Sequence, residues 1–428
     1  MVSHFRPHGT PVTRVYLHTF GCKANQYDTE VIRQALESAG ATAVDDPYEA
    51  DLAVVNSCTV THVSESKMRG LVRRIGRGNG GARTVVTGCA AELDDGTIAA
   101  LPGVSHVIGG ADPRRVLAAL GLASERLEPL LRDFKRGARA WLKIQDGCDE
   151  HCTFCATTLA RGQNRSRSPE EIVLEASALA GAHAEIVLTG VHIGTYGADR
   201  DDRASLSTLV ERLVTAVPGV RFRLSSIEAT EIDDRLAEIM VGNPDRLAPH
   251  IHSPLQSGSD RLLKRMGRHW YTVRSYRERL QWLAARLPRF GLGADVMVGF
   301  PGETDDDFAA TVQLLQGLPV TYLHVFPYSE RPGTAATRLG PAVDPRVTRN
   351  RTALLHELAA RKARSYRMRR TGGAADVVIL RRSKGRYEGL TGDYLQVYLA
   401  TDQVPPARFS AELELVEGTL FAKPLPPQ

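Results

Sequence analysis

Cysteine is scarce in this chain, which has six cysteines among its 428 residues. Long apolar runs are also lacking, and no stretch approaches the roughly 20 residues of a membrane-spanning helix. The first residues, 1–8, lack the apolar core of a signal peptide. We therefore expect a cytoplasmic protein without a membrane partner, in which the thiols stay reduced and can bind metal.

Neither sign of charge is in large excess, because the net charge is only +5. That value permits a nucleic-acid partner but does not require one. Hydrophobic residues make up 43% of the chain and charged residues 24%, which is ordinary for a globular protein. The length exceeds what one hydrophobic core usually supports, so we expect two or three domains.

Three of the cysteines, Cys148, Cys152 and Cys155, follow each other at C-x3-C-x2-C spacing behind an apolar run at 141–145. Three thiolates on a four-iron cluster leave one iron without a protein ligand, where a small molecule could bind and be reduced. The alternative is structural zinc, which takes four ligands, with His151 as the nearby fourth. A disulfide is less favoured because three is an odd number.

The other three cysteines each follow a predicted strand and precede a helical stretch. Cys22 follows strand 13–20, Cys58 follows strand 53–56, and Cys89 follows strand 83–87. Alternating strands and helices indicate a parallel sheet, whose carboxyl edge is where such folds bind ligands. We therefore predict a second three-thiolate metal site. The alternative reading of each cysteine is a small buried hydrophobic residue.

The central part of the chain shows six strand-like runs with helical stretches between them. The predicted strands are 141–145, 185–189, 221–227, 250–255, 294–300 and 322–327. Six units fall short of the eight of a closed (β/α)8 barrel, so we expect a partial barrel with its chemistry at the strand ends. Polar or glycine-rich groups follow four of these strands, at 189–190, 225–228, 256–260 and 299–303.

The last part of the chain combines a basic stretch with short strands. Nine basic residues lie within 346–370 against one acidic residue, and strands are predicted at 375–380, 395–399 and 411–415. Short strands separated by turns favour a small β-barrel. A basic segment leading into it suits contacts with RNA phosphates, although most charge runs are simply solvated helix faces.

These motifs together resemble one family, the radical S-adenosylmethionine methylthiotransferases. Cys148, Cys152, Phe154 and Cys155 match the C-x3-C-x-aromatic-C signature of radical S-adenosylmethionine enzymes. The segments around the other cysteines are similar to the family's second triad, and residues 254–259 and 298–304 also resemble it. The resemblance implies an α/β fold in three parts, which are a domain with a parallel sheet, a partial (β/α)6 barrel, and a small β-barrel similar to TRAM RNA-binding domains. We place these domains at 13–125, 134–365 and 366–425.

Within the family, residues 21–26, 225–228 and 325–329 most resemble the branch that acts on tRNA carrying threonylcarbamoyladenosine next to the anticodon. The resemblance implies an enzyme that adds a methylthio group to C2 of that adenine. Three alternatives stay open. They are the same chemistry on isopentenyladenosine tRNA or a ribosomal protein, a radical enzyme with another product, and a zinc-containing RNA-binding protein.

The resemblance also implies cofactors, site residues and partners. One [4Fe-4S] cluster on Cys148, Cys152 and Cys155 would bind S-adenosylmethionine, and a second on Cys22, Cys58 and Cys89 would supply sulfur. The expected contacts of S-adenosylmethionine are Phe154, Gly190, Ser226, Glu228 and Gln256. Expected partners are the tRNA anticodon stem-loop, a reductant such as flavodoxin or ferredoxin, and a sulfur donor. Arg161 and Arg331 are candidate partners for the carboxylate of the substrate.

Overall fold

The computed structural model describes residues 13–122, 130–135, 138–202, 204–401 and 403–426. The expected end of the first domain, residue 125, lies outside these residues, as do residues 1–8, for which we expected no signal peptide. The chain divides into two compact units, Met1–Leu131 and Arg132–Gln428. Within the described residues no helix is both long and apolar enough to cross a membrane.

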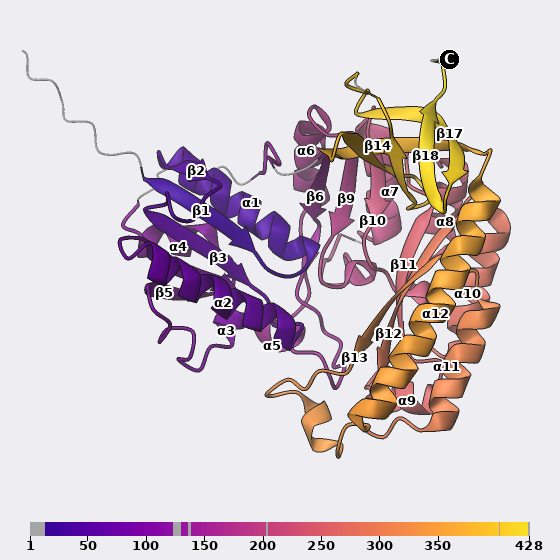
Figure 1. Cartoon of the computed structure of the whole chain (residues 1–428), viewed down its shortest axis with the longest axis horizontal. Helices are drawn as coiled ribbons and strands as arrows, with labels where there is room; N and C mark the ends of the chain where they lie inside the picture. The colour runs from indigo at the N-terminus through magenta and orange to yellow at the C-terminus, as the bar shows by residue number, and fades with distance from the viewer. Residues whose placement is uncertain (1–12, 123–129, 136–137, 203, 402, 427–428) are drawn as a thin grey trace, which may run out of the picture. The chain divides into compact units, whose positions relative to one another are not determined.

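The first unit is a five-stranded parallel sheet with strand order β2-β1-β3-β4-β5 (Figure 1). Its elements are β1 Arg14–Thr19, α1 Lys23–Ser38, β2 Thr42–Val44, β3 Leu52–Ser57, α2 His62–Gly78, β4 Arg83–Gly88, α3 Cys89–Glu92, β5 Val104–Gly109 and α4 Pro113–Ala119. Strand β3 is buried along its whole length, as expected for a strand covered on both faces. Helices α1 and α4 pack on one face, and α2 packs on the other.

The second unit begins with the six predicted strands of the partial barrel. Pairing is parallel in two groups, β10-β9-β6 and β11-β12-β13, which isolated bridges such as Ser226 to His252 join. The strands are β6 Arg139–Lys143, β9 Glu185–Thr189, β10 Arg221–Leu224, β11 His250–Gln256, β12 Gly291–Val298 and β13 Tyr322–Pro327. Strand β7 Gln145–Asp146 follows β6 directly and forms a short antiparallel pair with β8 Arg165–Ser166.

Helices alternate with these strands as the pattern predicts. They are α5 Thr157–Arg161, α6 Pro169–Ala180, η1 Ile193–Thr195, α7 Leu206–Ala216, η2 Ala229–Glu231, α8 Asp234–Gly242, α9 Asp260–Arg265, α10 Val273–Arg286, α11 Asp305–Gly317, η3 Ala335–Arg338 and α12 Pro345–Arg370. Side-chain caps fix where several of them start. At α11, the Thr304 side chain accepts from the backbone of Asp307 while the Asp307 side chain accepts from Thr304.

The chain ends in a closed barrel of five strands in the order β14-β15-β16-β18-β17. They are β14 Ala374–Ser383, β15 Arg386–Thr391, β16 Gln396–Leu399, β17 Arg408–Val416 and β18 Thr419–Pro424. The sequence predicted three of them and missed β15 and β18, because Gly389 and the charged residues of these segments obscure their apolar alternation. The parallel sheet, the six-stranded partial barrel and the closed small barrel confirm the expected fold class.

A buried ion network joins the partial barrel to the C-terminal barrel. The Glu185 carboxylate accepts from the guanidinium groups of Arg221 at 2.7 Å and Arg223 at 2.8 Å. Arg221 also donates to the Asp376 carboxylate on β14 at 2.7 Å, and Arg223 donates to the Gly392 carbonyl at 2.9 Å. Glu185, Arg221 and Arg223 are at most 1% exposed, so each charge depends on its partners.

This network leads to a prediction about stability. Replacing Glu185 with Gln leaves buried Arg223 without its anion and Arg221 with Asp376 alone, and breaking a buried ion pair typically costs about 3–5 kcal/mol. The three tryptophans, Trp141, Trp270 and Trp282, all lie in the second unit, so their fluorescence during urea unfolding reports on it. The Glu185→Gln variant should therefore unfold at clearly lower urea.

The matched control is Arg274→Ala, which removes an exposed ion pair with Glu278 on α10. Exposed pairs of this kind add little to stability, so the midpoint should barely move. Despite its burial, Glu185 has a pKa far below the ordinary value of 4.5, because Arg223 and Arg221 stabilise the carboxylate. The wild type's advantage over Glu185→Gln should thus be full above about pH 4.5 and shrink at lower pH. Equal midpoints at neutral pH would contradict this account.

Candidate active site and cluster-binding loops

The three cysteines of the first unit lie at the carboxyl ends of neighbouring strands. Cys22 is the residue before α1 and follows β1, Cys58 follows β3, and Cys89 follows β4 as the first residue of α3. Strands β1, β3 and β4 are adjacent in the sheet. Cys58 and Cys89 are buried, whereas Cys22 is exposed to solvent.

Asn25 on α1 connects the loops that carry these cysteines. Its side-chain amide donates to the carbonyls of Phe20 and Ser57, at 2.9 Å in both cases. Its carbonyl oxygen lies 3.8 Å from the Cys89 sulfur. Sequence reasoning assigned Asn25 no role, although it stands within the Gly-Cys-Lys-Ala-Asn-Gln motif around Cys22. One buried amide thus joins the loops that carry Cys22 and Cys58 and lies next to Cys89.

Gly21 shows how closely the first two loops approach. A Cβ atom at this position would lie 2.8 Å from the Cys58 sulfur, which is closer than real Cβ contacts. The backbone φ of Gly21 is +109°, a conformation that side chains rarely adopt. Glycine is therefore required beside Cys22, and Cys58 lies directly against the Gly21–Cys22 segment.

The other three cysteines, Cys148, Cys152 and Cys155, lie in one loop between β7 and α5. The loop begins at Gly147, where φ is +72° and a Cβ would lie 1.8 Å from the Gln163 carbonyl oxygen. The backbone amide of Cys148 donates to the Gly162 carbonyl at 3.0 Å, and that of Cys155 donates to the Cys152 carbonyl at 3.0 Å. These two hydrogen bonds fix the backbone conformation of the loop before α5 begins.

Each thiol of this loop has a polar neighbour. His192 Nδ1 lies 3.5 Å from the Cys148 sulfur, Arg268 donates to the Cys152 sulfur at 3.6 Å, and the Thr157 amide donates to the Cys155 sulfur at 3.4 Å. His151, the fourth ligand of the zinc alternative, is exposed. The histidine that meets the triad is His192, from the segment after β9, which the sequence pattern did not identify.

The donor set fits an iron–sulfur cluster. None of the six cysteines, all of them described, forms a disulfide. Burial raises the pKa of the Cys152 thiol to about 12, more than the nearby Arg268 lowers it. A buried sulfur of this kind needs a proton or a metal ion, and iron takes the place of the proton in a cluster.

The other predicted contact residues lie around the same end of the partial barrel. Gly190 follows β9, and a Cβ there would lie 2.7 Å from the Gln145 carbonyl oxygen. Gln145 in turn donates to the carbonyl of Gly147, just before Cys148, at 2.6 Å. The Phe154 ring packs edge-on against Phe300, with the ring centroids 6.4 Å apart. Gly190 thus packs against the strand that leads into the cysteine loop, and Phe154, within that loop, contacts Phe300 after β12.

Glu228, Gln256 and Ser226 occupy the carboxyl ends of β10 and β11. Buried Glu228 pairs with Arg268, which also contacts Cys152. Burial raises the pKa of Glu228, in opposition to the effect of Arg268. Gln256 is buried with φ at +61°, and its Oε1 has no hydrogen-bond partner in the described part of the chain. Ser226 is exposed, and its backbone bridges to His252.

Comparisons with known proteins show the family of this chain. Residues 14–109 match the family described as "Uncharacterized protein family UPF0004", and residues 142–315 match the Radical SAM superfamily. The chain is 40% identical to the threonylcarbamoyladenosine tRNA methylthiotransferase MtaB of Bacillus subtilis, over 82% of this chain and 81% of the relative. The chain belongs to the radical S-adenosylmethionine methylthiotransferase family.

Two further similarities concern the substrate and the fold. The tRNA-2-methylthio-N(6)-dimethylallyladenosine synthase of Zymomonas mobilis is 32% identical over 86% of each chain. The solved structure of the radical S-adenosylmethionine methyltransferase TsrM from Kitasatospora setae, with cobalamin and a [4Fe-4S] cluster bound, has a TM-score of 0.58. It is 16% identical and covers 76% of this chain and 77% of that chain, which supports the fold alone. As a member of the family, this chain uses S-adenosylmethionine and a [4Fe-4S] cluster.

The two sets of cysteines lead to a prediction about iron content. Anaerobically reconstituted protein should contain about eight iron and eight sulfide ions per chain, as two [4Fe-4S] clusters require. Replacing Cys22, Cys58 and Cys89 with Ala should remove about half of both while the protein still forms 5′-deoxyadenosine. Replacing Cys148, Cys152 and Cys155 should remove the other half together with that product. Zinc without sulfide in either set would refute a cluster there.

Asn25 leads to a second prediction. The Asn25→Ala variant should lose at least about half of the iron held by the first unit, because the loops carrying Cys22 and Cys58 lose their shared donor. Formation of 5′-deoxyadenosine should continue. The control is Asn79→Ala, which also removes an amide that donates to backbone carbonyls, such as Ala50 at 2.8 Å, but before the start of β3. Equal iron loss in the two variants would make Asn25 a general stabiliser only.

Proposed function

We propose that this protein is a tRNA methylthiotransferase that converts N6-threonylcarbamoyladenosine, next to the anticodon, to its 2-methylthio derivative. The observation that carries the proposal is the pair of three-cysteine sets, one at the carboxyl ends of neighbouring strands and one in a single loop, in a chain 40% identical to an MtaB methylthiotransferase. A transfer of sulfur to an unactivated carbon needs both a radical source and a sulfur source, and two clusters serve these two needs.

The residues in and around the loop that carries Cys148, Cys152 and Cys155 have distinct proposed roles. Cys148, Cys152 and Cys155 hold a [4Fe-4S] cluster, and Phe154, Gly190, Ser226, Glu228 and Gln256 contact S-adenosylmethionine. When bound, the cofactor and its cluster supply the one-electron cleavage that generates an organic radical. Arg268 holds the Glu228 carboxylate and touches Cys152, so one side chain aligns the cofactor pocket with the cluster loop. Buried Gln256 offers an unpaired side-chain oxygen that can accept a hydrogen bond from the cofactor.

The first unit has a proposed role in sulfur delivery. Cys22, Cys58 and Cys89 hold the second [4Fe-4S] cluster, which three thiolates leave open at one iron. The exposed position of Cys22 gives that open side access to solvent, where an external sulfur donor can reach it. A small electron carrier such as flavodoxin or ferredoxin is the proposed reductant. Because tRNA is the substrate, we place the protein in the cytoplasm.

The proposed contact with tRNA involves the last part of the chain. We propose three domains, at 13–125, 134–365 and 366–425, with the last as a TRAM-like RNA-binding domain. The basic helix α12 divides into two kinds of residue. Arg351 and Arg370 are buried and pair with Glu303 and Asp393, so they stabilise the fold. The exposed basic residues of α12 remain for phosphate contacts, and they are Arg346, Arg349, Arg361, Arg364 and Arg369.

The test uses reconstituted holoenzyme with a chemical reductant and S-adenosylmethionine. One reaction contains tRNA bearing threonylcarbamoyladenosine and a parallel one contains tRNA bearing isopentenyladenosine. Nucleoside mass spectrometry should find a methylthio mass gain in the first reaction only. A gain in the second reaction only would assign the protein to the dimethylallyladenosine branch, a candidate that the relative from Zymomonas mobilis keeps open. Deoxyadenosine without any mass gain would refute both substrates.

A further inference from the structure

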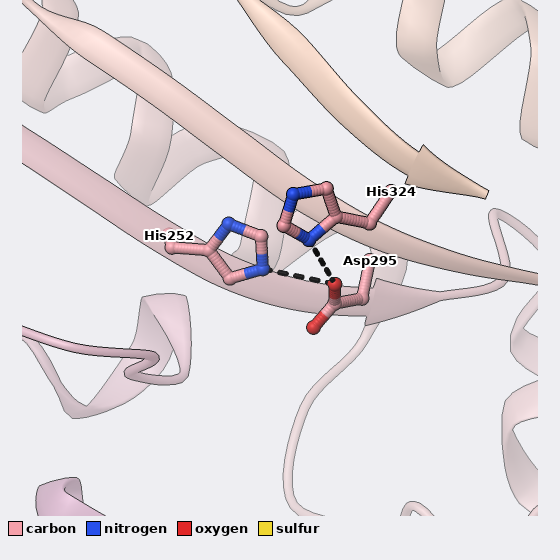
Figure 2. A group of neighbouring side chains, drawn as sticks. All are labelled: His252, Asp295 and His324. Carbon is pink, nitrogen blue, oxygen red and sulfur yellow. Dashed lines mark hydrogen bonds and ion pairs between the residues drawn. The ribbon is translucent and has the colours of Figure 1, made fainter. Parts of the chain in front are cut away.

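Two histidines and an aspartate meet on three adjacent strands of the partial barrel (Figure 2). His252 lies on β11, Asp295 on β12 and His324 on β13. Asp295 Oδ1 lies 2.9 Å from His252 Nε2 and 3.2 Å from His324 Nδ1. Both imidazoles therefore converge on one carboxylate oxygen. Neither the cluster loops nor the proposed contacts of S-adenosylmethionine include these residues.

The register of the sheet explains why the three side chains meet. Asp295 pairs with His324 on β13 and with Pro254 on β11. His252 is two residues before Pro254, and side chains two apart point to the same face of a strand. The three side chains thus share one face, as Figure 2 shows. The arrangement is set by backbone pairing of three strands rather than by a mobile loop.

The distances between these atoms fit the coordination sphere of a transition metal ion. Imidazole nitrogen and carboxylate oxygen bind zinc at about 2.0–2.2 Å, so two ligands of a tetrahedral ion are about 3.3–3.6 Å apart. The three ligand atoms here all lie within 4.8 Å of one another. The two imidazole nitrogens lie 2.9 and 3.2 Å from the Asp295 oxygen, so each of these pairs would separate by only a few tenths of an ångström on binding a metal ion. The two nitrogens, at most 4.8 Å apart, would approach each other by at most about 1.5 Å. Two histidines and one carboxylate with open positions are a ligand set of catalytic metal sites.

The Tyr322 hydroxyl contacts the ring nitrogen of His252 that faces away from the site, as the hydrogen-bond partners of metal-binding histidines do. The Tyr322 hydroxyl lies 3.0 Å from His252 Nδ1 and 2.8 Å from His250 Nε2. If the hydroxyl accepts from Nδ1 and donates to His250, Nε2 of His252 carries its lone pair toward the site. Gly293 makes room for this ring, because a Cβ there would lie 2.1 Å from Tyr322.

The site lies on the face of the sheet that also carries the cysteine loop. Asp295 and Met297 are two apart on β12, as are His324 and Phe326 on β13, so each pair shares a face. Met297 and Phe326 belong to the same packed cluster as Phe154 of the cysteine loop. The His324 side chain is 60% exposed, which leaves a path to the site.

We propose that His252, Asp295 and His324 bind one divalent transition-metal ion, and that its open positions hold the carboxylate of the modified adenosine. The second part rests on the proposed function. A divalent ion bound by one carboxylate and two neutral imidazoles keeps a net positive charge, which attracts an anionic ligand. A prenyl group offers no donor atom to such an ion. Arg161, a candidate for this carboxylate from the sequence, instead pairs with Asp146 at 2.7 Å.

The first experiment measures metal binding without tRNA. Anaerobic holoenzyme with both clusters reconstituted is dialysed against Zn²⁺, and bound zinc is counted by mass spectrometry. The wild type should bind about one zinc ion more per chain than His324→Ala. His324 is exposed, so the substitution leaves the packing intact. The control is His356→Ala, an exposed histidine on α12, which should bind as much zinc as the wild type. Equal zinc in all three proteins would overturn the site.

The second experiment measures affinity for the substrate carboxylate. With Zn²⁺ present, the wild type should bind an anticodon stem-loop carrying threonylcarbamoyladenosine about tenfold more tightly than the unmodified stem-loop. The His324→Ala variant should lose that preference, and His356→Ala should keep it. A preference that survives in His324→Ala would overturn the carboxylate role even if zinc binding is lost. Both readouts are independent of turnover, so failure of the methylthiolation assay is a separate result.

Discussion

Parallel strand pairing is the constraint on which the proposed sites depend. In a parallel sheet every strand ends at the same edge, so the segments that follow the strands lie together however far apart they are in sequence. In the first unit this brings Cys22, Cys58 and Cys89 to one edge, although 67 residues separate the first from the last. In the partial barrel it places Gly190, Glu228 and Gln256 at the end that the cysteine loop also occupies.

Buried charge holds the second unit together. A carboxylate between two arginines is costly to bury, and the cost is offset only when each group keeps its full set of hydrogen bonds. Glu185, Arg221 and Arg223 meet this condition through Asp376 and backbone carbonyls of the C-terminal barrel. The segment between β15 and β16, which contains Gly392, also holds α12, because its Asp393 pairs with Arg370. The small barrel is therefore fixed to the partial barrel rather than attached by a free linker.

Strand periodicity and residue spacing predicted much of the fold and part of the site. The three cysteine-bearing strands of the first unit and all six barrel strands lie within a few residues of their predicted positions, because buried parallel strands read as continuous apolar runs. The side chains that complete the sites were harder to predict. Asn25, His192 and Arg268 reach the thiols from other segments, and neither composition nor spacing shows which of many polar residues will do so.

The sequence by itself determined the number of thiols in each set, the alternation of strands and helices, and the family. These properties depend on local order along the chain, which residue spacing preserves. Only the tertiary structure decided which residues of the basic segment are buried, because an arginine pairs with whatever carboxylate the fold presents to it. The same holds for His252, Asp295 and His324. Asp295 follows His252 by 43 residues and precedes His324 by 29, and the register of three parallel strands alone places them on one face.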